Sequence, residues 1–235
     1  MLGVEFIVNE NETVHTFNTW ELKWTKVVIS QPKAKTYIVN VPFSNNNIDM
    51  TEVFGDITYN NRTITLEFDY IGKVNEWQTT YSDILNVLQG QNVKMILDTD
   101  KAFYWEGRLD INSTNDDYIT NTVTITATVY PYKKERNNSL EPWLWDTFNF
   151  KNGIIRNYKD IVIDGYEIIN IPNRREKIIP TFICNIDMQV IYNNKTYNLP
   201  SGETQILDIQ LSEGDNILKF KGNGIVSIVY RGGSL

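Results

Sequence analysis

Strict alternation of apolar and polar residues limits what this chain can fold into more than any other feature. In RTITLEFDY (62–70), isoleucine, leucine, phenylalanine and tyrosine take every second position, with polar residues between them. A period of two is the signature of a strand with one buried face. TVTITATVY (122–130) repeats the pattern, with a row of threonines on its outer face. We therefore predict a fold that is mainly β.

Short β-branched and aromatic runs extend this prediction over most of the first half. A turn at DTDK (98–101) joins two of the runs as a hairpin. The predicted strands are VEFIV (4–8), VHTFNTW (14–20), TKVVIS (25–30), TYIVNV (36–41), VKMIL (93–97) and FYWEGRL (103–109).

One segment, NEWQTTYSDILNVLQG (75–90), departs from the β pattern. Its large apolar residues fall on one stripe of an α-helix. Asn75 is a suitable N-cap, Gln78 a capping-box partner and Gly90 a left-handed C-terminal cap. We predict one helix at about 75–90 that lies across a sheet with its stripe inward. The stripe consists of Trp77, Tyr81, Ile84, Leu85 and Leu88.

The sequence changes character at YPYKKERNNSLEPW (130–143). Two prolines, a charge run and paired asparagines predict a linker there, with a boundary near residues 133–140. The predicted domains are 1–135 and 136–235. The second half consists of short predicted strands separated by turns at the spacing of a β-sandwich. The predicted turns are Asp164-Gly165, Asn193-Asn194, Ser201-Gly202, Glu213-Gly214-Asp215 and Gly222-Asn223-Gly224.

The net charge of -7 argues against nucleic-acid binding through phosphate neutralisation. Two basic clusters, KKER (133–136) and RREK (174–177), each contain a glutamate and are predicted to be solvated surface. No apolar run reaches the roughly 20 residues needed to cross a bilayer, and the N-terminus lacks the features of a signal peptide. We expect no membrane contact, and synthesis in a reducing cytoplasm.

The chain offers few parts for catalysis or metal binding. Its one histidine, His15, and its one cysteine, Cys184, fall in different predicted domains. Cys184 lies in an apolar strand and is predicted to be a small core residue. The acidic pairs all lie in predicted turns, where Asp makes local backbone hydrogen bonds. A calcium site at 208–215 suits loop oxygens better than catalysis does, but no EF-hand pattern is present. We expect no enzymatic activity, no cofactor and no metal.

Two tryptophans, Trp143 and Trp145, occupy one side of a predicted strand just after the linker. Their functional interpretation is a platform on which a sugar ring stacks. The favoured interpretation is a core at the domain edge, because tryptophans bury large areas. A carbohydrate-binding module that uses these two residues is the alternative function.

Five short motifs follow one another in a fixed order within residues 1–135. They are a Val-Pro loop ending in Ile-Asp, an R-x-I-x-x-x-F strand, a helix closing on L-x-G, a strand with Tyr followed by Gly-Arg, and a strand ending in P-Y-K. They correspond here to Val41-Pro42 through Ile48-Asp49, Arg62–Phe68, Leu88–Gly90, Tyr104–Arg108 and Pro131-Tyr132-Lys133. The series resembles the N-terminal domain of the distal tail proteins of long-tailed, non-contractile bacteriophages (the Dit family).

The second half is similar to the galectin-like or carbohydrate-module-like sandwich that ends many of these tail proteins. With this resemblance, the expected fold class is mainly β. It comprises an N-terminal β-sandwich-like domain with one helix at about 75–90, followed by a C-terminal β-sandwich that is a galectin-like jelly roll. Such a fold does not by itself imply sugar binding.

The resemblance implies a structural virion protein of the phage tail tip, assembled in the cytoplasm of a host bacterium. Copies of the N-terminal domain would form a ring, expected to be a hexamer, that joins the tail tube to the tail-tip apparatus. The implied partners are the chain itself, the major tail or tube protein and the tail-tip protein, with a receptor-binding protein as a further candidate. DNA would pass through the ring without specific binding. Acidic residues lining that channel would keep DNA from adhering.

The loop VPFSNNNIDMTEVF (41–54) combines a polar tip with apolar flanks and no catalytic residue types. We predict that it makes subunit or tube contacts. The family often has glycines in this loop, whereas this chain has Phe43 and asparagines. Because asparagine tolerates the left-handed backbone, Asn46 or Asn47 is expected to make the turn. The predicted contact residues are Pro42, Phe43, Asn45, Asn46, Asn47, Ile48, Met50 and Phe54.

Overall fold

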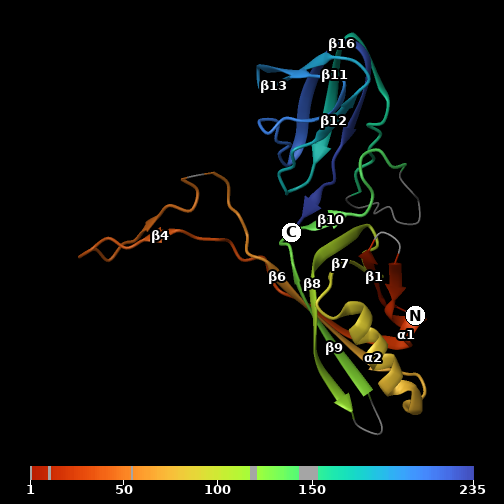
Figure 1. The fold of residues 1–235 in the computed structure, drawn as a ribbon. Helices are drawn as coiled ribbons and strands as arrows, with labels where there is room; N and C mark the ends of the chain where they lie inside the picture. The colour runs from red at the N-terminus through yellow and green to blue at the C-terminus, as the bar shows by residue number, and fades with distance from the viewer. Residues whose placement is uncertain (1, 10–11, 54, 117–120, 143–152) are drawn as a thin grey trace. The chain divides into compact units, whose positions relative to one another are not determined.

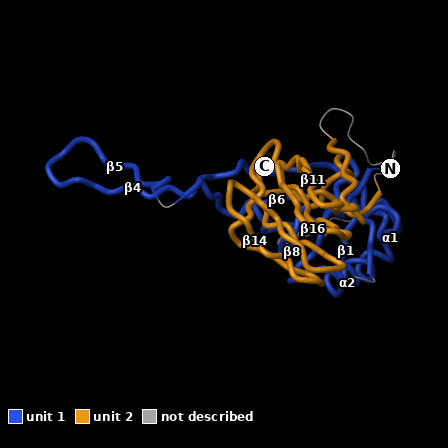
Figure 2. Tube along the Cα trace, turned by 90° about the horizontal axis from the view of Figure 1, so that it is seen from above, with its two compact units in different colours: residues 1–99, 105–131 blue, residues 100–104, 132–235 orange. Residues whose placement is uncertain are grey.

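Strands in three antiparallel sheets account for about half of the computed structural model, so the prediction of a mainly β fold is confirmed. The structure describes residues 2–9, 12–53, 55–116, 121–142 and 153–235 (Figure 1). It divides into two compact units (Figure 2). Unit 1 comprises residues 1–99 and 105–131, and unit 2 comprises residues 100–104 and 132–235. The assignment of separate domains to 1–135 and 136–235 stays a prediction.

Unit 1 is built on a sheet in which seven strands follow the order β2-β1-β7-β8-β9-β6-β3. Neighbours in this path pair antiparallel, and β3 forms one open edge. The strands are β1 Val4–Asn9, β2 Glu12–His15, β3 Leu22–Ile29, β6 Arg62–Tyr70, β7 Asn92–Leu97, β8 Phe103–Asp116 and β9 Asn121–Val129.

The core of unit 1 forms where the alternating strands predicted it. The apolar faces of β6 and β9 are buried, and Leu66 lies opposite Ile125 in the antiparallel register. Helix α2 (Trp77–Leu88) packs onto the same core through Trp77, Ile84 and Leu88 (Figure 1). Each such large apolar side chain contributes roughly 1.5–3 kcal/mol when it is fully buried. The predicted helix and its inward stripe are confirmed.

The start of this helix differs from the prediction. A short 3-10 helix, η1 (Val74–Glu76), contains Asn75, and no side chain caps α2. The amide of Glu76 donates to the carbonyl of Lys73 at 2.9 Å. A 3-10 turn thus satisfies backbone donors that an N-cap would otherwise serve, and the predicted roles of Asn75 and Gln78 are wrong. Gly90 does adopt a left-handed φ of 72°.

A second helix, α1 (Thr16–Trp20), occupies most of a segment predicted as strand, so that prediction is wrong. His15 Nδ1 accepts a hydrogen bond from the amide of Asn18, which caps the helix. The hydroxyl of Thr16 accepts from the amide of Val4, and the buried Trp20 donates Nε1–H to Asp83. These contacts with residues distant in the sequence outweigh the β preference of the segment.

Unit 2 contains a sheet with the order β14-β13-β16-β12-β15, to which β11 adds along β16. Two short strands, β10 and β17, pair with each other, and β10 also pairs with Phe103 and Tyr104 of β8. The core of unit 2 is apolar and includes Phe182, Val190 and Phe220. The strands are β10 Lys133–Glu135, β11 Ile161–Asn173, β12 Thr181–Cys184, β13 Met188–Tyr192, β14 Lys195–Leu199, β15 Gly202–Gln205, β16 Gly214–Val229 and β17 Gly233–Ser234.

Two of the predicted turns in the second half are wrong. Asp164-Gly165 and Gly222-Asn223-Gly224 lie opposite each other in the continuous β11–β16 ribbon. Gly165 and Gly222 have positive φ there, because a glycine within a strand marks a bend and not a chain reversal. By contrast, Asn193-Asn194 is the two-residue loop of the β13–β14 hairpin, with both φ angles positive as a type I′ turn requires.

Candidate protein-interaction site

Residues 31–60 form a narrow two-stranded arm between β3 and β6, and Figure 2 shows it leaving the compact part of unit 1. We call this segment the arm. Its strands are β4 (Ile38–Val39) and β5 (Ile48–Asp49), which pair antiparallel. The predicted strand at 36–41 is thus much shorter than expected. Further backbone hydrogen bonds hold the two sides together, from Asn60 N to Lys33 O, from Lys35 N to Thr58 O and from Met50 N to Tyr37 O.

The root of the arm is fixed by the buried side chain of Arg62. Its Nε donates to the carbonyl of Ser30 at 2.8 Å, and its guanidinium lies 4.7 Å from the ring centroid of Trp105. Burial lowers the pKa of Arg62, but a guanidinium remains protonated at any physiological pH. Ser30 and Thr63 exchange two further hydrogen bonds. The arm therefore leaves the sheet from a rigid base.

The described residues of the arm form no core of their own. None of the described residues between 31 and 60 is buried, and none belongs to the apolar core of unit 1. An isolated hairpin without a packed face is marginally stable in water. Clustered exposed apolar side chains mark contact surfaces. Those on the arm are Tyr37, Ile38, Phe43, Ile48, Val53 and Ile57.

The tip of the arm is a tight turn around Pro42-Phe43. The amide of Ser44 donates to the carbonyl of Val41 at 3.2 Å, and Phe43 has a φ of 61°. Proline at the second position and a positive φ at the third are the features of a type II turn. The expectation that Asn46 or Asn47 supplies the left-handed residue is wrong. In a type II turn with Pro42 at the second position, the left-handed φ belongs to the third position, which is Phe43.

The structure places most of the predicted contact residues together on this exposed tip. Residues 42–48 are all exposed, and Met50 is half-buried. Phe54 lies outside the described residues, as do Trp143 and Trp145, so the alternative sugar platform also falls outside them. That the tip contacts other proteins stays a prediction.

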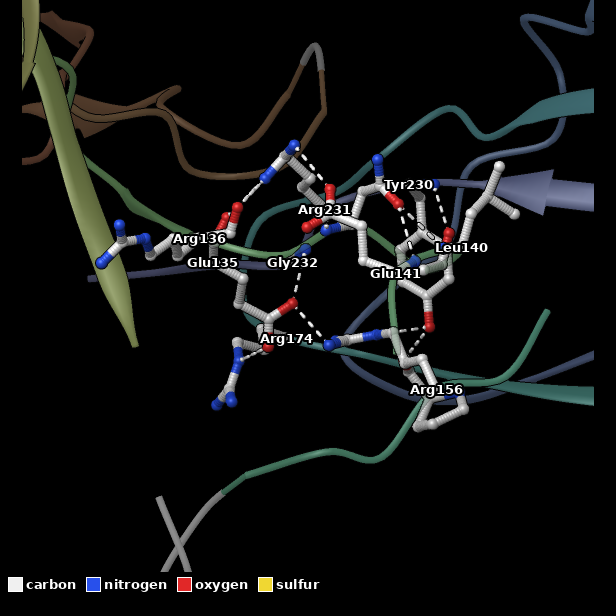
Figure 3. A network of polar contacts seen from close by, with 12 residues as sticks. Glu135, Arg136, Leu140, Glu141, Arg156, Arg174, Tyr230, Arg231 and Gly232 are labelled. Carbon is white, nitrogen blue, oxygen red and sulfur yellow. Dashed lines mark hydrogen bonds and ion pairs between the residues drawn. The ribbon is translucent and has the colours of Figure 1, made fainter. Parts of the chain in front are cut away.

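A second cluster was missed by sequence reasoning, which predicted solvated surface for both basic clusters. Glu135 is buried, and its carboxylate pairs with Arg156 Nη1 and with Arg174 Nε, each at 2.5 Å (Figure 3). It also accepts from the amide of Gly232 at 3.0 Å. The glutamate that interrupts the basic run is thus the centre of an ion-pair network, and β10 is a packed strand. Spacing alone gives no signal for such a long-range pairing.

The network holds the C-terminal strand in place. Lys133 and Lys134 of β10 pair with β17, and Arg231 donates to the carbonyls of Glu135 and Arg136. Tyr230 accepts from Arg156 Nε at 2.8 Å, and burial raises the pKa of its hydroxyl. These contacts join chain segments of unit 2 to one another, which indicates a structural role, although Arg156 Nη2 has no hydrogen-bond partner among the described residues.

The residues considered for catalysis or metal binding are paired with other side chains or buried in a core. His15 Nε2 lies 3.1 Å from Asp98 in unit 1, whereas Cys184 is buried in the core of unit 2, where burial raises the pKa of its thiol. Lys133 pairs with Asp100, and Arg175 pairs with Glu213 of the considered calcium loop. Within the described ranges, no group of three or more acidic, His or Cys side chains is placed to hold a metal ion. No helix among the described residues is long and apolar enough to span a membrane.

Comparison with known proteins identifies a solved structure with the same fold, but no match by sequence. No family model matches the sequence, and no curated protein matches it. Among solved structures, the chain is similar to the crystal structure of the SPP1 Dit protein (gp 19.1), which is described as a paradigm of the hub adsorption apparatus in phages that infect Gram-positive bacteria. The TM-score is 0.64 at 10% sequence identity, over 100% of both chains. Over its full length, the chain has the fold of SPP1 Dit.

Proposed function

We propose that this protein is a structural subunit of a phage tail hub and not an enzyme. The observation that carries the proposal is an anchored, solvent-exposed apolar arm on a chain with the full-length fold of SPP1 Dit. In this proposal, copies of the chain form a closed ring, expected to be a hexamer, that joins the tail tube to the tail-tip apparatus. Unit 2 offers surfaces for adhesion components. The protein acts as part of the virion after assembly in the bacterial cytoplasm.

The arm supports this proposal because it fits a head-to-tail interface. A ring of identical subunits joins two different surfaces of each copy, so a projecting element on one copy meets a separate surface on the next. At about 3.3 Å per residue, an extended stretch from residue 30 to residue 41 spans about 35 Å. That reach is comparable with the diameter of a small domain. The rigid root at Arg62 sets the direction of the arm.

The acidic charge of the chain supports the part of the proposal in which DNA passes through the ring without binding to it. A net charge of -7 per subunit argues against a channel that binds DNA by neutralising its phosphates. We infer that acidic side chains face the channel and repel DNA during passage. An assembled ring with a strongly basic channel would end this part of the proposal.

The proposal is tested by removing the arm. The amide of Lys35 and the carbonyl of Thr58 are already hydrogen-bonded across the arm, so residues 36–57 can be replaced by Asn-Gly, which closes a two-residue hairpin. The shortened chain should keep the melting temperature of unit 1, because no described arm residue is in its core. It should fail to form rings in native mass spectrometry, alone and with tail tube protein. Rings of normal stoichiometry from the shortened chain would refute the role of the arm.

A further inference from the structure

The C-terminal segment of unit 2, residues 231–234, lies against two acidic side chains, and we call this segment the latch. Its two glycines, Gly232 and Gly233, are both buried. A Cβ added to Gly232 would lie 2.9 Å from a carboxylate oxygen of Glu135, and a Cβ added to Gly233 would lie 1.9 Å from Oε2 of Glu176. The latch therefore fits here because glycine lets its backbone approach both acidic groups closely.

The first of these carboxylates, that of Glu135, is well supplied with partners. It pairs with Arg156 and with Arg174, each at 2.5 Å, and it accepts a hydrogen bond from the amide of Gly232 at 3.0 Å (Figure 3). The amide of Glu135 donates in turn to the carbonyl of Gly232 at 3.0 Å. Because an ionised acceptor forms the stronger hydrogen bond, Glu135 holds the latch in its charged form.

The second carboxylate, that of Glu176, has no such support. Its Oε2 is buried and has no hydrogen-bond partner among the described residues. Glu176 holds the latch through its main chain, since its amide donates to the carbonyl of Gly233 at 3.0 Å. From β10, Lys134 attracts the carboxylate, but burial outweighs this attraction and raises the pKa of Glu176. Closure of the latch therefore favours the neutral carboxyl.

The basic residues next to Glu176 in the chain do not neutralise it. The two arginines before it are engaged with other carboxylates, Arg174 with Glu135 and Arg175 with Glu213, and the lysine after it, Lys177, is exposed. Within the described ranges, Glu176 forms no ion pair. An ionised Glu176 under a closed latch is thus a buried charge without a hydrogen bond, which is unfavourable.

We propose that the latch of unit 2 closes when Glu176 is protonated and opens when Glu176 is ionised. Movement of Gly233 away from the carboxylate admits water, which stabilises the charge. Opening also frees the edge of β10 that pairs with β17, while the other edge of β10 stays paired with Phe103 and Tyr104. The latch is therefore a pH-sensitive device at the C-terminus of the chain.

The direction of the effect follows from the pKa of Glu176. This pKa is raised in the closed state by burial, whereas water surrounds the carboxyl in the open state. A group whose pKa is raised by closure favours closure at low pH, and this contribution is lost as pH rises through the closed-state pKa. Acid should therefore close the latch, and neutral to alkaline pH should open it.

Amide hydrogen exchange of the whole chain measures the latch without requiring a ring. Three amides donate across it, those of Gly232, Glu135 and Glu176. After correction for the pH dependence of chemical exchange, their protection should fall by about tenfold or more between about pH 4 and pH 8, the order expected for a buried charge without a partner. Amides of β13, which is paired with β16 in the core, serve as the reference and should keep their protection.

Two substitutions identify the group that operates the latch. Glu176→Gln keeps the shape of the side chain and cannot ionise, so protection of the latch amides should no longer depend on pH. Glu213→Gln is the matched control, because Glu213 pairs with Arg175 at 2.8 Å and its side chain is 58% exposed. The control should show the same loss of protection with rising pH as the parent chain.

Each outcome supports or overturns the proposal. A loss of protection in Glu176→Gln as steep as that of the parent chain would assign the pH dependence to another group. Loss of protection in β13 in parallel with the latch would mean that unit 2 unfolds as a whole, and the latch would be refuted. If Glu176→Gln does not fold, the parent chain still decides. The ¹³C resonance of the Glu176 carboxyl should titrate with the same midpoint as the loss of protection, and different midpoints would refute the assignment.

Discussion

The carboxylate of Glu135 and the guanidinium of Arg156 form an ion pair at 2.5 Å in which both side chains are more than nine-tenths buried. Glu135→Gln keeps the shape of the side chain and removes its charge, which leaves the buried Arg156 without the carboxylate that it pairs with. Breaking a buried pair on one side costs about 3–5 kcal/mol. We expect a loss of that order in the stability of unit 2, measured by native-state hydrogen exchange at residues 231–234.

The matched control is Glu141→Gln in the same network. Glu141 pairs with Arg231 at 3.4 Å, and its side chain is 44% exposed. Exposed pairs contribute up to about 1 kcal/mol, so this change should have a small effect. Equal effects of the two substitutions would mean that burial does not determine the strength of the Glu135 pair.

The buried carboxylate of Glu176 should make the stability of the protein depend on pH. Its Oε2 is buried and has no hydrogen-bond partner in the described part of the chain. Burial raises the pKa of Glu176, and Lys134 offsets this only partly. A folded-state pKa above the unfolded value contributes stability below the unfolded pKa, and this stability is lost as pH rises through the folded pKa. Glu176→Gln should therefore stabilise the protein in urea denaturation at pH 8 and change little at pH 4. A variant that is less stable at pH 8 would contradict this account.

Because Arg62 holds the root of the arm, we expect Arg62→Lys to destabilise that root. Lysine has no planar group to stack on Trp105 and no Nε to reach the carbonyl of Ser30. We expect a loss of about 1–3 kcal/mol, seen as faster hydrogen exchange at the amides of Ser30 and Thr63. The exposed Arg108, which donates to the carbonyl of Gly90, gives the control. Arg108→Lys should leave exchange at the arm root unchanged.

Helices and strands that bury one face show a periodic pattern of apolar residues, so these elements were predictable from the sequence. The alternation in β6 and β9 and the stripe of α2 exist because each element has one face in the core of unit 1. Helix α1 was not predictable in this way, because it depends on contacts of Thr16 and Trp20 with β1 and α2. The prediction of a turn at Gly222-Asn223-Gly224 was wrong for a related reason. A glycine that bends a paired strand has the same local sequence as one that reverses the chain.

The sequence indicated which residues form the candidate site, but it did not indicate the backbone conformation of those residues. Residues 42–48 stood out because a polar tip interrupted strand-like sequence, but the left-handed residue proved to be Phe43 and not an asparagine. The ion-pair network could not be predicted, because Glu135, Arg156 and Gly232 are brought together only by the path of the chain. Exposed charge and buried paired charge have the same composition.

Gly107 on β8 gives the final prediction, because the backbone of β9 passes directly over it. Gly107 pairs with Val129, and a Cβ added at Gly107 would overlap the carbonyl oxygen of Thr128 and lie 2.6 Å from Val129 Cα. Backbone atoms of a paired strand cannot move aside without breaking the ladder, so the clash is not relieved by a rotamer change. Gly107→Ala should therefore destabilise unit 1 by about 1–3 kcal/mol or more, the usual cost of overpacking.

The neighbouring Trp105 is buried and reports this unfolding by its fluorescence. Glu106→Ala is the control on the same strand and should have a much smaller effect, because it shortens a half-buried side chain and adds no atom next to the backbone of β9. An unaltered melting transition in Gly107→Ala would show that β8 and β9 tolerate a wider separation. The expected loss would mean that position 107 of this chain requires glycine.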